Sequence, residues 1–276
     1  MKRSGKTYAP MQKEMVEILP LSVAAKQQKQ DVTQKMQSGI DCIDNSIDGG
    51  FREGDFTIIS GVPGGGKTSL ARMFTTAFSE KGIPSIWFSY EMTITELWDS
   101  FEKMGADSSL ISYVPIVMEH EYDWIIEHIE KARVEFGVRA IFIDTIRDVV
   151  KPINGRQEQN YSLYVEQLCK DLRDYAIKNR MMVFAIAHAT KQTRSNTEET
   201  SNSDIAYSNG IPATATNIFH VWRSKKRKEE DITYVKIGKS RRDGTKKDWK
   251  YQFKFWQEKL IPVDNKRYED LADEFE

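Results

Sequence analysis

The sequence predicts an α/β fold in which a mostly parallel, twisted sheet is flanked by helices and ends in a C-terminal antiparallel extension. Short apolar runs of strand length alternate with runs of helix length, which is typical of a parallel sheet with helices on both faces. A glycine-rich loop at Gly61–Thr68 separates the first strand candidate from the first helix candidate. The last three strand candidates have no long helix between them, which favours antiparallel pairing there.

The expected elements follow in a regular order. The strand candidates are 55–60, 84–89, 139–144, 181–187, 217–222, 231–239 and 249–256. The helix candidates are 67–80, 94–105, 122–136 and 161–179. Thr93 and Glu96 have the spacing of a capping box, which predicts the start of the second helix. Residues 190–212 are rich in Thr, Ser and Asn, and a polar loop of this length in a compact domain is usually functional.

Composition excludes several classes of protein. The 276 residues carry a net charge of −1, so any contact with nucleic acid depends on local basic patches. Cys42 and Cys169 are far apart and form no metal-ligand cluster, which favours a reducing compartment. No apolar run approaches the roughly 20 residues of a membrane span, and the N-terminus lacks the apolar core of a signal peptide. We therefore expect a cytoplasmic protein (host cytoplasm if phage-encoded) with no membrane partner.

Residues 1–36 differ from the core that we expect at 37–276. They are polar and basic, and one amphipathic stretch carries Met11, Met15, Ile18 and Leu19. Two interpretations stay open for this segment. It is a frayed tail, or it is a helix that docks on another subunit.

The loop Gly-Val-Pro-Gly-Gly-Gly-Lys-Thr has the pattern of a phosphate-binding loop. Glycines let successive backbone N–H groups turn inward around phosphate oxygens, and the start of the following helix adds its positive dipole end. Lys67 can reach the β- and γ-phosphates, and the Thr68 hydroxyl can bind Mg²⁺. We therefore expect ATP, or another nucleoside triphosphate, with Mg²⁺. The expected nucleotide-binding residues are Gly61, Pro63, Gly64, Gly65, Gly66, Lys67, Thr68 and Ser69.

Two carboxylates follow apolar strands. Asp144 ends the run Ala140–Ile143, where a second carboxylate commonly holds Mg²⁺, often through water. Glu91 follows the strand at 84–89, from which a carboxylate would face the γ-phosphate and activate water. The alternative for Glu91 is a surface residue that caps the next helix, and the order of elements favours catalysis.

Three further residues are candidates for sensing or stabilising the phosphates. His188 ends the strand at 181–187, where a histidine could bond the γ-phosphate and report its loss; the alternative is an ordinary half-buried residue. Lys239 and Arg241 lie at the end of a late strand. Such a basic turn is usually a solvated surface, but it could also supply an arginine finger to the nucleotide of a neighbouring subunit.

These motifs together resemble the RecA-fold motor domain of DnaB-type replicative helicases, in particular the branch of the phage primase-helicase and its mitochondrial relative. The resemblance covers roughly Gln37 to Trp256. It rests on the lead-in Ser38–Asp44 and Gly49–Asp55, the phosphate loop, Phe88–Met92, Ile186–His188 and Lys239–Arg241. It implies a water-activating role for Glu91, a phosphate-sensing role for His188, and a finger, Arg241 with Lys239, that acts in trans.

The resemblance also implies a ring, usually a hexamer, with nucleotide at subunit interfaces and single-stranded DNA at the centre. Loops after the strands that end at Asp144 and His188 would then face DNA. The candidate DNA-binding residues are Lys151, Asn154, Gly155, Arg156, Lys191, Gln192 and Arg194. Only about 36 residues precede the core, so we expect a separate primase or loader protein to supply any further N-terminal function. The stretch Ser195–Ala213 lacks a close match to the family pattern.

The leading interpretation is a DNA-stimulated ATPase that translocates on single-stranded DNA as a ring. One alternative is a DNA-binding filament protein of the recombinase branch, in which ATP locks a binding state. A second alternative is a regulatory ATPase of the circadian-clock or signalling type that acts on protein partners. Binding to single-stranded DNA at low salt discriminates the second alternative from the other two.

Overall fold

The computed structural model describes residues 19–23, 35–149, 158–189, 199–206, 210–224, 232–242 and 249–263. The chain divides into two units, residues 1–33 and 34–276. In the first unit the described residues include one helical turn at 21–23. The candidate docking stretch from Met11 to Ile18 lies outside the described residues, so its role stays a prediction. All further description concerns the second unit.

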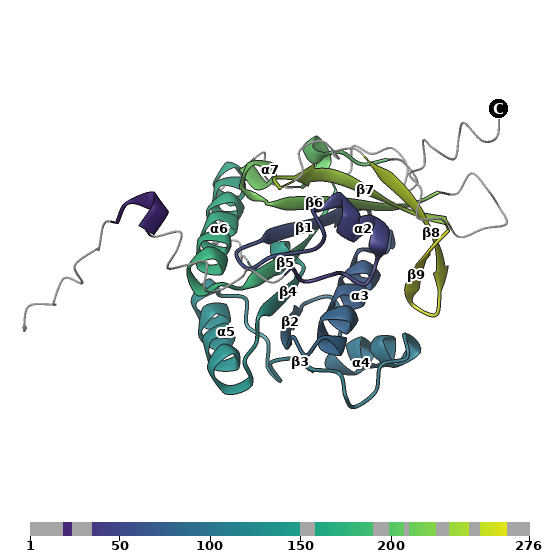
Figure 1. Cartoon of the computed structure of the whole chain (residues 1–276), viewed down its shortest axis with the longest axis horizontal. Helices are drawn as coiled ribbons and strands as arrows, with labels where there is room; N and C mark the ends of the chain where they lie inside the picture. Colours follow the sequence, from purple (N-terminus) through teal and green to yellow (C-terminus); the bar gives the residue numbers. More distant parts are fainter. Residues whose placement is uncertain are drawn as a thin grey trace, which may run out of the picture. The chain divides into compact units, whose positions relative to one another are not determined.

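The second unit is built on one nine-stranded sheet (Figure 1). Its strand order is β3-β2-β4-β5-β1-β6-β7-β8-β9. The strands are β1 (Phe56–Gly61), β2 (Ser85–Ser89), β3 (Ser112–Tyr113), β4 (Ala140–Asp144), β5 (Met182–His188), β6 (Asn217–Ser224), β7 (Ile232–Ser240), β8 (Lys250–Trp256) and β9 (Lys259–Pro262). Pairing is parallel from β3 through β6 and antiparallel from β6 through β9.

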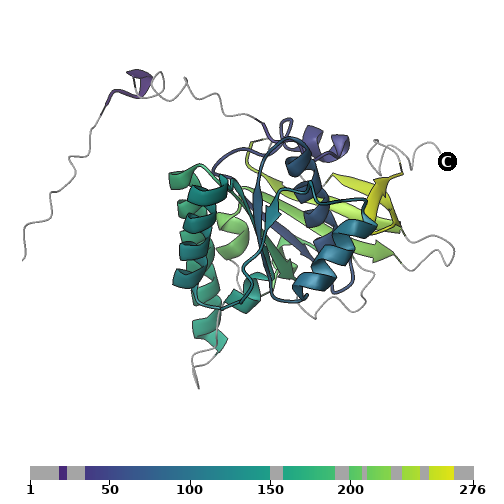
Figure 2. The same ribbon diagram turned by 90° about the horizontal axis from the view of Figure 1, so that it is seen from below.

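Helices cover both faces of this sheet (Figures 1 and 2). The α-helices are α2 (Asp41–Ser46), α3 (Lys67–Glu80), α4 (Ile94–Lys103), α5 (Tyr122–Phe136), α6 (Glu158–Asn179) and α7 (Gly210–Thr214). Two short 3-10 helices are η1 (Ile146–Val149) and η2 (Asn202–Asp204). No described helix has the length and apolar character needed to cross a membrane.

Two apolar cores hold the layers together, one on each face of the sheet. Phe74 and Phe78 of α3 pack with Phe51 and with the inward side chains of the strands on one face. Ile125 of α5 and Leu172 of α6 pack on the other face. Strands β1, β4 and β5 are therefore buried on both faces, which explains why they read as continuous apolar runs.

The predicted fold class is confirmed: the sheet is mostly parallel, helices flank it, and the C-terminal strands are antiparallel. The capping box of α4 is present, with the Glu96 N–H donating to Thr93 Oγ1 at 3.2 Å. The prediction that residues 190–212 are one loop was wrong in its described part, because η2 and the first turn of α7 lie there. Elements of this size carry too few residues for a periodic pattern.

Candidate active site

The phosphate loop lies between β1 and α3, as predicted. Gly66 has a φ of 103°, a conformation that favours glycine, and a Cβ on Gly65 would lie 2.9 Å from the Val221 carbonyl oxygen. The Lys67 side chain is buried, and its Nζ donates to the Val62 carbonyl at 2.9 Å. Burial lowers the pKa of Lys67, while the charges of Asp144 and Glu91 oppose that shift. The ammonium thus lies across the loop, next to the N-terminus of α3.

Asp144 and Thr68 meet beside the loop. The Thr68 hydroxyl donates to Asp144 Oδ2 at 2.7 Å. The second carboxylate oxygen, Oδ1, is buried and accepts no hydrogen bond from the described residues. A buried carboxylate oxygen without a donor, next to a hydroxyl and a phosphate loop, fits the oxygen ligands that Mg²⁺ prefers. Thr68 and Asp144 would hold the ion, directly or through water.

The carboxyl of Asp144 gives the site a pH dependence. Burial raises its pKa from 3.8 to about 6, so the folded chain favours the protonated form. That contribution to stability is complete below pH 4 and is lost as pH rises through 6. Because a metal ligand must be deprotonated, we expect the affinity for Mg²⁺-ATP to fall about fourfold between pH 7.5 and 5.5. Calorimetry at both pH values measures this, and Asp144→Asn should bind weakly with little pH dependence; an equal fall in that variant contradicts the assignment.

Glu91 and His188 are brought together from the ends of two strands. His188 Nε2 lies 2.7 Å from Glu91 Oε1, which joins the segment after β2 to the end of β5. The hydrogen bond from His188 lowers the pKa of Glu91, so this carboxylate is ionised at neutral pH. The alternative that Glu91 caps α4 does not describe the structure, because Thr93 and Glu96 form that cap. The Nδ1 atom of His188 is buried without a partner among the described residues.

Lys239 and Arg241 lie at the opposite edge of the sheet from the phosphate loop. The Arg241 N–H donates to Thr216 O, and the Thr216 N–H donates to Phe56 O, so Arg241 lies level with the first residue of β1. The phosphate loop follows Gly61, the last residue of that strand. A strand rises about 3.3 Å per residue, which places the two ends roughly 17 Å apart. Arg241 therefore does not reach the phosphate site of its own chain.

Both basic side chains contact the end of α7. Lys239 Nζ donates to the Pro212 carbonyl and, at 3.3 Å, to the Ala213 carbonyl. The Arg241 guanidinium also donates to the Ala213 carbonyl. Burial lowers the pKa of Lys239 to about 8, and the nearby charge of Arg241 acts in the same direction. The two cations are thus held close together at one edge of the sheet.

One pair of groups beside the phosphate loop was not predicted. Strand β6 passes the loop, with the Trp222 Cα 3.5 Å from the position of a Cβ on Gly65. The next residue, Arg223, holds its guanidinium carbon 4.3 Å from the centre of the Phe255 ring. A guanidinium and an aromatic ring are groups that stack on nucleobases. Residues separated this far in sequence give no local motif, so sequence reasoning had no signal for this pair.

A buried ion pair ties the helix of the phosphate loop to the C-terminal hairpin. Arg72 of α3 is 3% exposed, and its NH2 donates to Glu258 at 2.7 Å and to the Ser69 hydroxyl at 3.0 Å. Glu258 lies in the turn between β8 and β9. Ser69, predicted to bind nucleotide, is therefore held by a side chain that the sequence did not single out.

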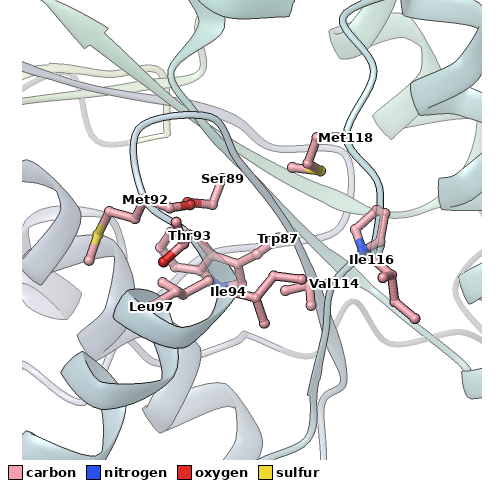
Figure 3. Close-up of a pocket in the computed structure, with 10 residues that line it drawn as sticks. Trp87, Ser89, Met92, Thr93, Ile94, Leu97, Val114, Ile116 and Met118 are labelled. Atoms are coloured by element: carbon pink, nitrogen blue, oxygen red, sulfur yellow. The ribbon is translucent and has the colours of Figure 1, made fainter.

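A pocket of about 300 Å³ lies beside Glu91 (Figure 3). Its lining is Trp87, Ser89, Met92, Thr93, Ile94, Leu97, Val114, Pro115, Ile116 and Met118. Apart from two hydroxyls the lining side chains are apolar, and the Ser89 hydroxyl already donates to the Met92 carbonyl at 3.0 Å. A triphosphate requires several N–H or cationic donors, so this pocket is not the phosphate site.

The predicted DNA-binding residues could not be placed. Lys151, Asn154, Gly155, Arg156, Lys191, Gln192 and Arg194 all lie outside the described residues. Their strands end where the prediction required, because β4 and β5 are neighbours and point the same way. The DNA-facing role of these loops stays a prediction.

A phosphate loop after the first strand, with a strand-end carboxylate beside it and neighbouring strands that end in Glu91 and His188, defines a P-loop NTPase of RecA-like fold. The chain belongs to the KaiC family of ATPases, whose family model matches residues 36–207, more than half of the chain. It is thus a RecA-fold ATPase of the DnaB/KaiC type. No curated protein sequence matches the chain.

Solved structures agree with this fold. One ATPase domain has a TM-score of 0.69 at 16% identity, over 88% of this chain and 97% of that one. A DnaB-like replicative helicase, solved in a study of its interactions with primase, has a TM-score of 0.72 at 17% identity, over 90% and 69%. A KaiC-like protein from the archaeon Pyrococcus horikoshii OT3 has a TM-score of 0.65 at 19% identity, over 84% and 100%. The resemblance to DnaB-type motor domains is confirmed.

Proposed function

We propose that the chain is a DNA-stimulated ATPase that translocates on single-stranded DNA as a ring, with each active site shared between two subunits. The observation that carries this proposal is the position of Arg241, at the edge of the sheet opposite its own phosphate loop. A cationic pair at that edge is useful for hydrolysis only if it serves the nucleotide of a neighbouring copy. Head-to-tail contacts of this kind generate closed rings when the rotation between copies closes.

Hydrolysis in such a site divides among a few side chains. Lys67 transfers its hydrogen bonds from Val62 to the β- and γ-phosphates, while Thr68 and Asp144 hold the metal. Bound Mg²⁺ would neutralise part of the phosphate charge. Glu91 orients the attacking water and accepts its proton, and Arg241 of the neighbouring copy stabilises the charge that develops on the γ-phosphate.

His188 links the presence of nucleotide to the readiness of Glu91. In its neutral form the ring has one N–H, and Nε2 lies against Glu91. A γ-phosphate oxygen would compete with Glu91 for that proton. Binding of triphosphate therefore frees Glu91 for water, and loss of the γ-phosphate restores the contact between the two side chains.

Arg223 and Phe255 are proposed to bind the nucleobase. Since their interaction with the base is the same before and during reaction, Arg223→Ala should raise the KM for ATP about fivefold and leave kcat nearly unchanged. Inhibition by inorganic tripolyphosphate, which has no base, serves as the control and should not change. A rise in KM that is matched by weaker tripolyphosphate inhibition would mean that the phosphate loop itself was disturbed.

The function is tested by ATP turnover with and without single-stranded DNA, alongside mass measurement of the assembly. We expect stimulation by DNA at low salt, weaker stimulation as salt rises, and a mass of several copies in the presence of Mg²⁺-ATP. Lys67→Ala provides the matched control, because it should abolish turnover under every condition. Equal turnover with and without DNA at low salt would reject the DNA motor.

The match to the KaiC family favours a second candidate, a regulatory ATPase that acts on protein partners. It has the same phosphate chemistry and the same need for assembly, so ATP turnover alone does not separate it from the motor. Filter binding to single-stranded DNA across a salt series does separate them. Absence of binding at low salt, together with an intact assembly, supports the regulatory role.

A further inference from the structure

Residues 199–206, here called the strap, connect the strand that carries His188 to the strand that carries Arg241. At its C-terminal end the strap pairs with β5 and the residue after it: Ala189 forms an antiparallel bridge with Ile205, and the Ala206 N–H donates to the His188 carbonyl at 2.9 Å. At its start, Glu199 accepts from Lys236 at 2.8 Å and from Lys250 at 2.7 Å. The strap is thus fastened at both ends.

Asn202 makes the contact nearest to the finger. Its Nδ2 donates to the Gly238 carbonyl at 2.9 Å, and its Oδ1 lies 2.8 Å from His220 Nε2. A carbonyl only accepts hydrogen bonds, so the amide nitrogen faces Gly238 and the amide oxygen accepts from His220. Gly238 immediately precedes Lys239, and Arg241 follows two residues later.

This junction is tightly packed. A Cβ on Gly238 would lie 2.5 Å from His220 Nε2 and 2.6 Å from Asn202 Oδ1. No side chain fits there without moving one of these two partners. Three chain segments therefore meet at one point, and the amide of Asn202 joins the strap to β7 just before the strand delivers its two cations.

We propose that Asn202 is a positioning residue for Arg241: it fixes the end of β7 so that the guanidinium meets the nucleotide of the neighbouring copy. This inference rests on the proposed trans role of Arg241. Asn202 touches neither nucleotide nor finger, and it acts through the backbone of Gly238. Its loss should therefore impair the site next door and spare the site of its own chain.

The experiment uses two full-length chains that are each inactive alone. Lys67→Ala removes the phosphate site but leaves Arg241, and Arg241→Ala removes the finger but leaves the phosphate site. Mixed, they restore activity at interfaces where the first chain donates the finger and the second holds ATP. Asn202→Ala is then placed in either chain, and ATP turnover is compared with the unmodified mixture.

We expect about a fivefold loss when Asn202→Ala is in the finger-donating chain, which is the effect of one neutral hydrogen bond, and less than a twofold change when it is in the ATP-holding chain. Gly238→Ala should show the same asymmetry from the other side of the contact, and Ser203→Ala, at the exposed neighbouring position, should change neither mixture. Equal losses in both chains, or a loss only in the ATP-holding chain, overturn the inference. If the unmodified mixture fails to restore activity, the trans finger itself is wrong.

Discussion

Glu91→Gln is expected to bind ATP as the natural chain does and to lose turnover by about 100- to 10,000-fold. Glutamine keeps the size of the side chain and still accepts the hydrogen bond that His188 makes at 2.7 Å, so the local structure is preserved. An amide cannot accept the proton of the attacking water. Binding is measured by calorimetry with Mg²⁺-ATP, and turnover is measured by phosphate release.

Glu96→Gln is the matched control for this variant. Glu96 lies five residues further along, is exposed, and forms the capping box of α4, a role that glutamine also fills. It should retain full turnover. Turnover of Glu91→Gln close to that of Glu96→Gln would remove Glu91 from the mechanism, and loss of ATP binding would point to a structural role instead.

Arg241→Ala is expected to lower turnover by about 1,000- to 100,000-fold, the range of an arginine finger. In the chain itself the Arg241 side chain contacts only the edge of α7 among the described residues, through the Ala213 carbonyl, so the substitution should leave folding nearly unchanged. Arg242→Lys is the control, because Arg242 forms an ion pair within its own chain, at 2.7 Å from Asp55, and a lysine can retain that pair.

Mixing Arg241→Ala subunits with natural subunits tests the trans role directly. Each active site needs a phosphate loop from one natural copy and a finger from another. In an equal mixture the active fraction of sites is therefore about one quarter if only natural neighbours support the reaction, below the one half that independent chains would give. A linear decrease with the fraction of the variant would show that each chain hydrolyses ATP without its neighbour.

The sheet, its long helices and the phosphate loop could be predicted because each has a local signature. Continuous apolar runs indicated β1, β4 and β5, since strands buried on both faces have no polar side to alternate. Gly61–Thr68 and Asp144 have spacing and context that few other functions require. Glu91 and His188 could be named because strand ends of a parallel sheet converge on one edge, and the structure brings them into contact.

Other parts of the site could not be predicted, because they depend on pairing across the sheet. Arg223 meets Phe255 and Arg72 meets Glu258 only once the C-terminal strands fold back antiparallel beside β6. The edge at which Arg241 lies follows from register, and register is set by packing between strands instead of by any motif. Very short elements, such as α7 and η2, contain too few residues to show a period.

The phosphate loop and the finger occupy opposite edges of one sheet, and this gives every chain a direction: one end receives and the other end donates. In an open row of such chains the last phosphate loop always lacks a donor, so a row of n chains contains n − 1 complete sites. Closing the row supplies the missing site. Turnover per chain would then rise with the length of the row and reach its maximum at closure, so that the rate itself reports whether the assembly is closed.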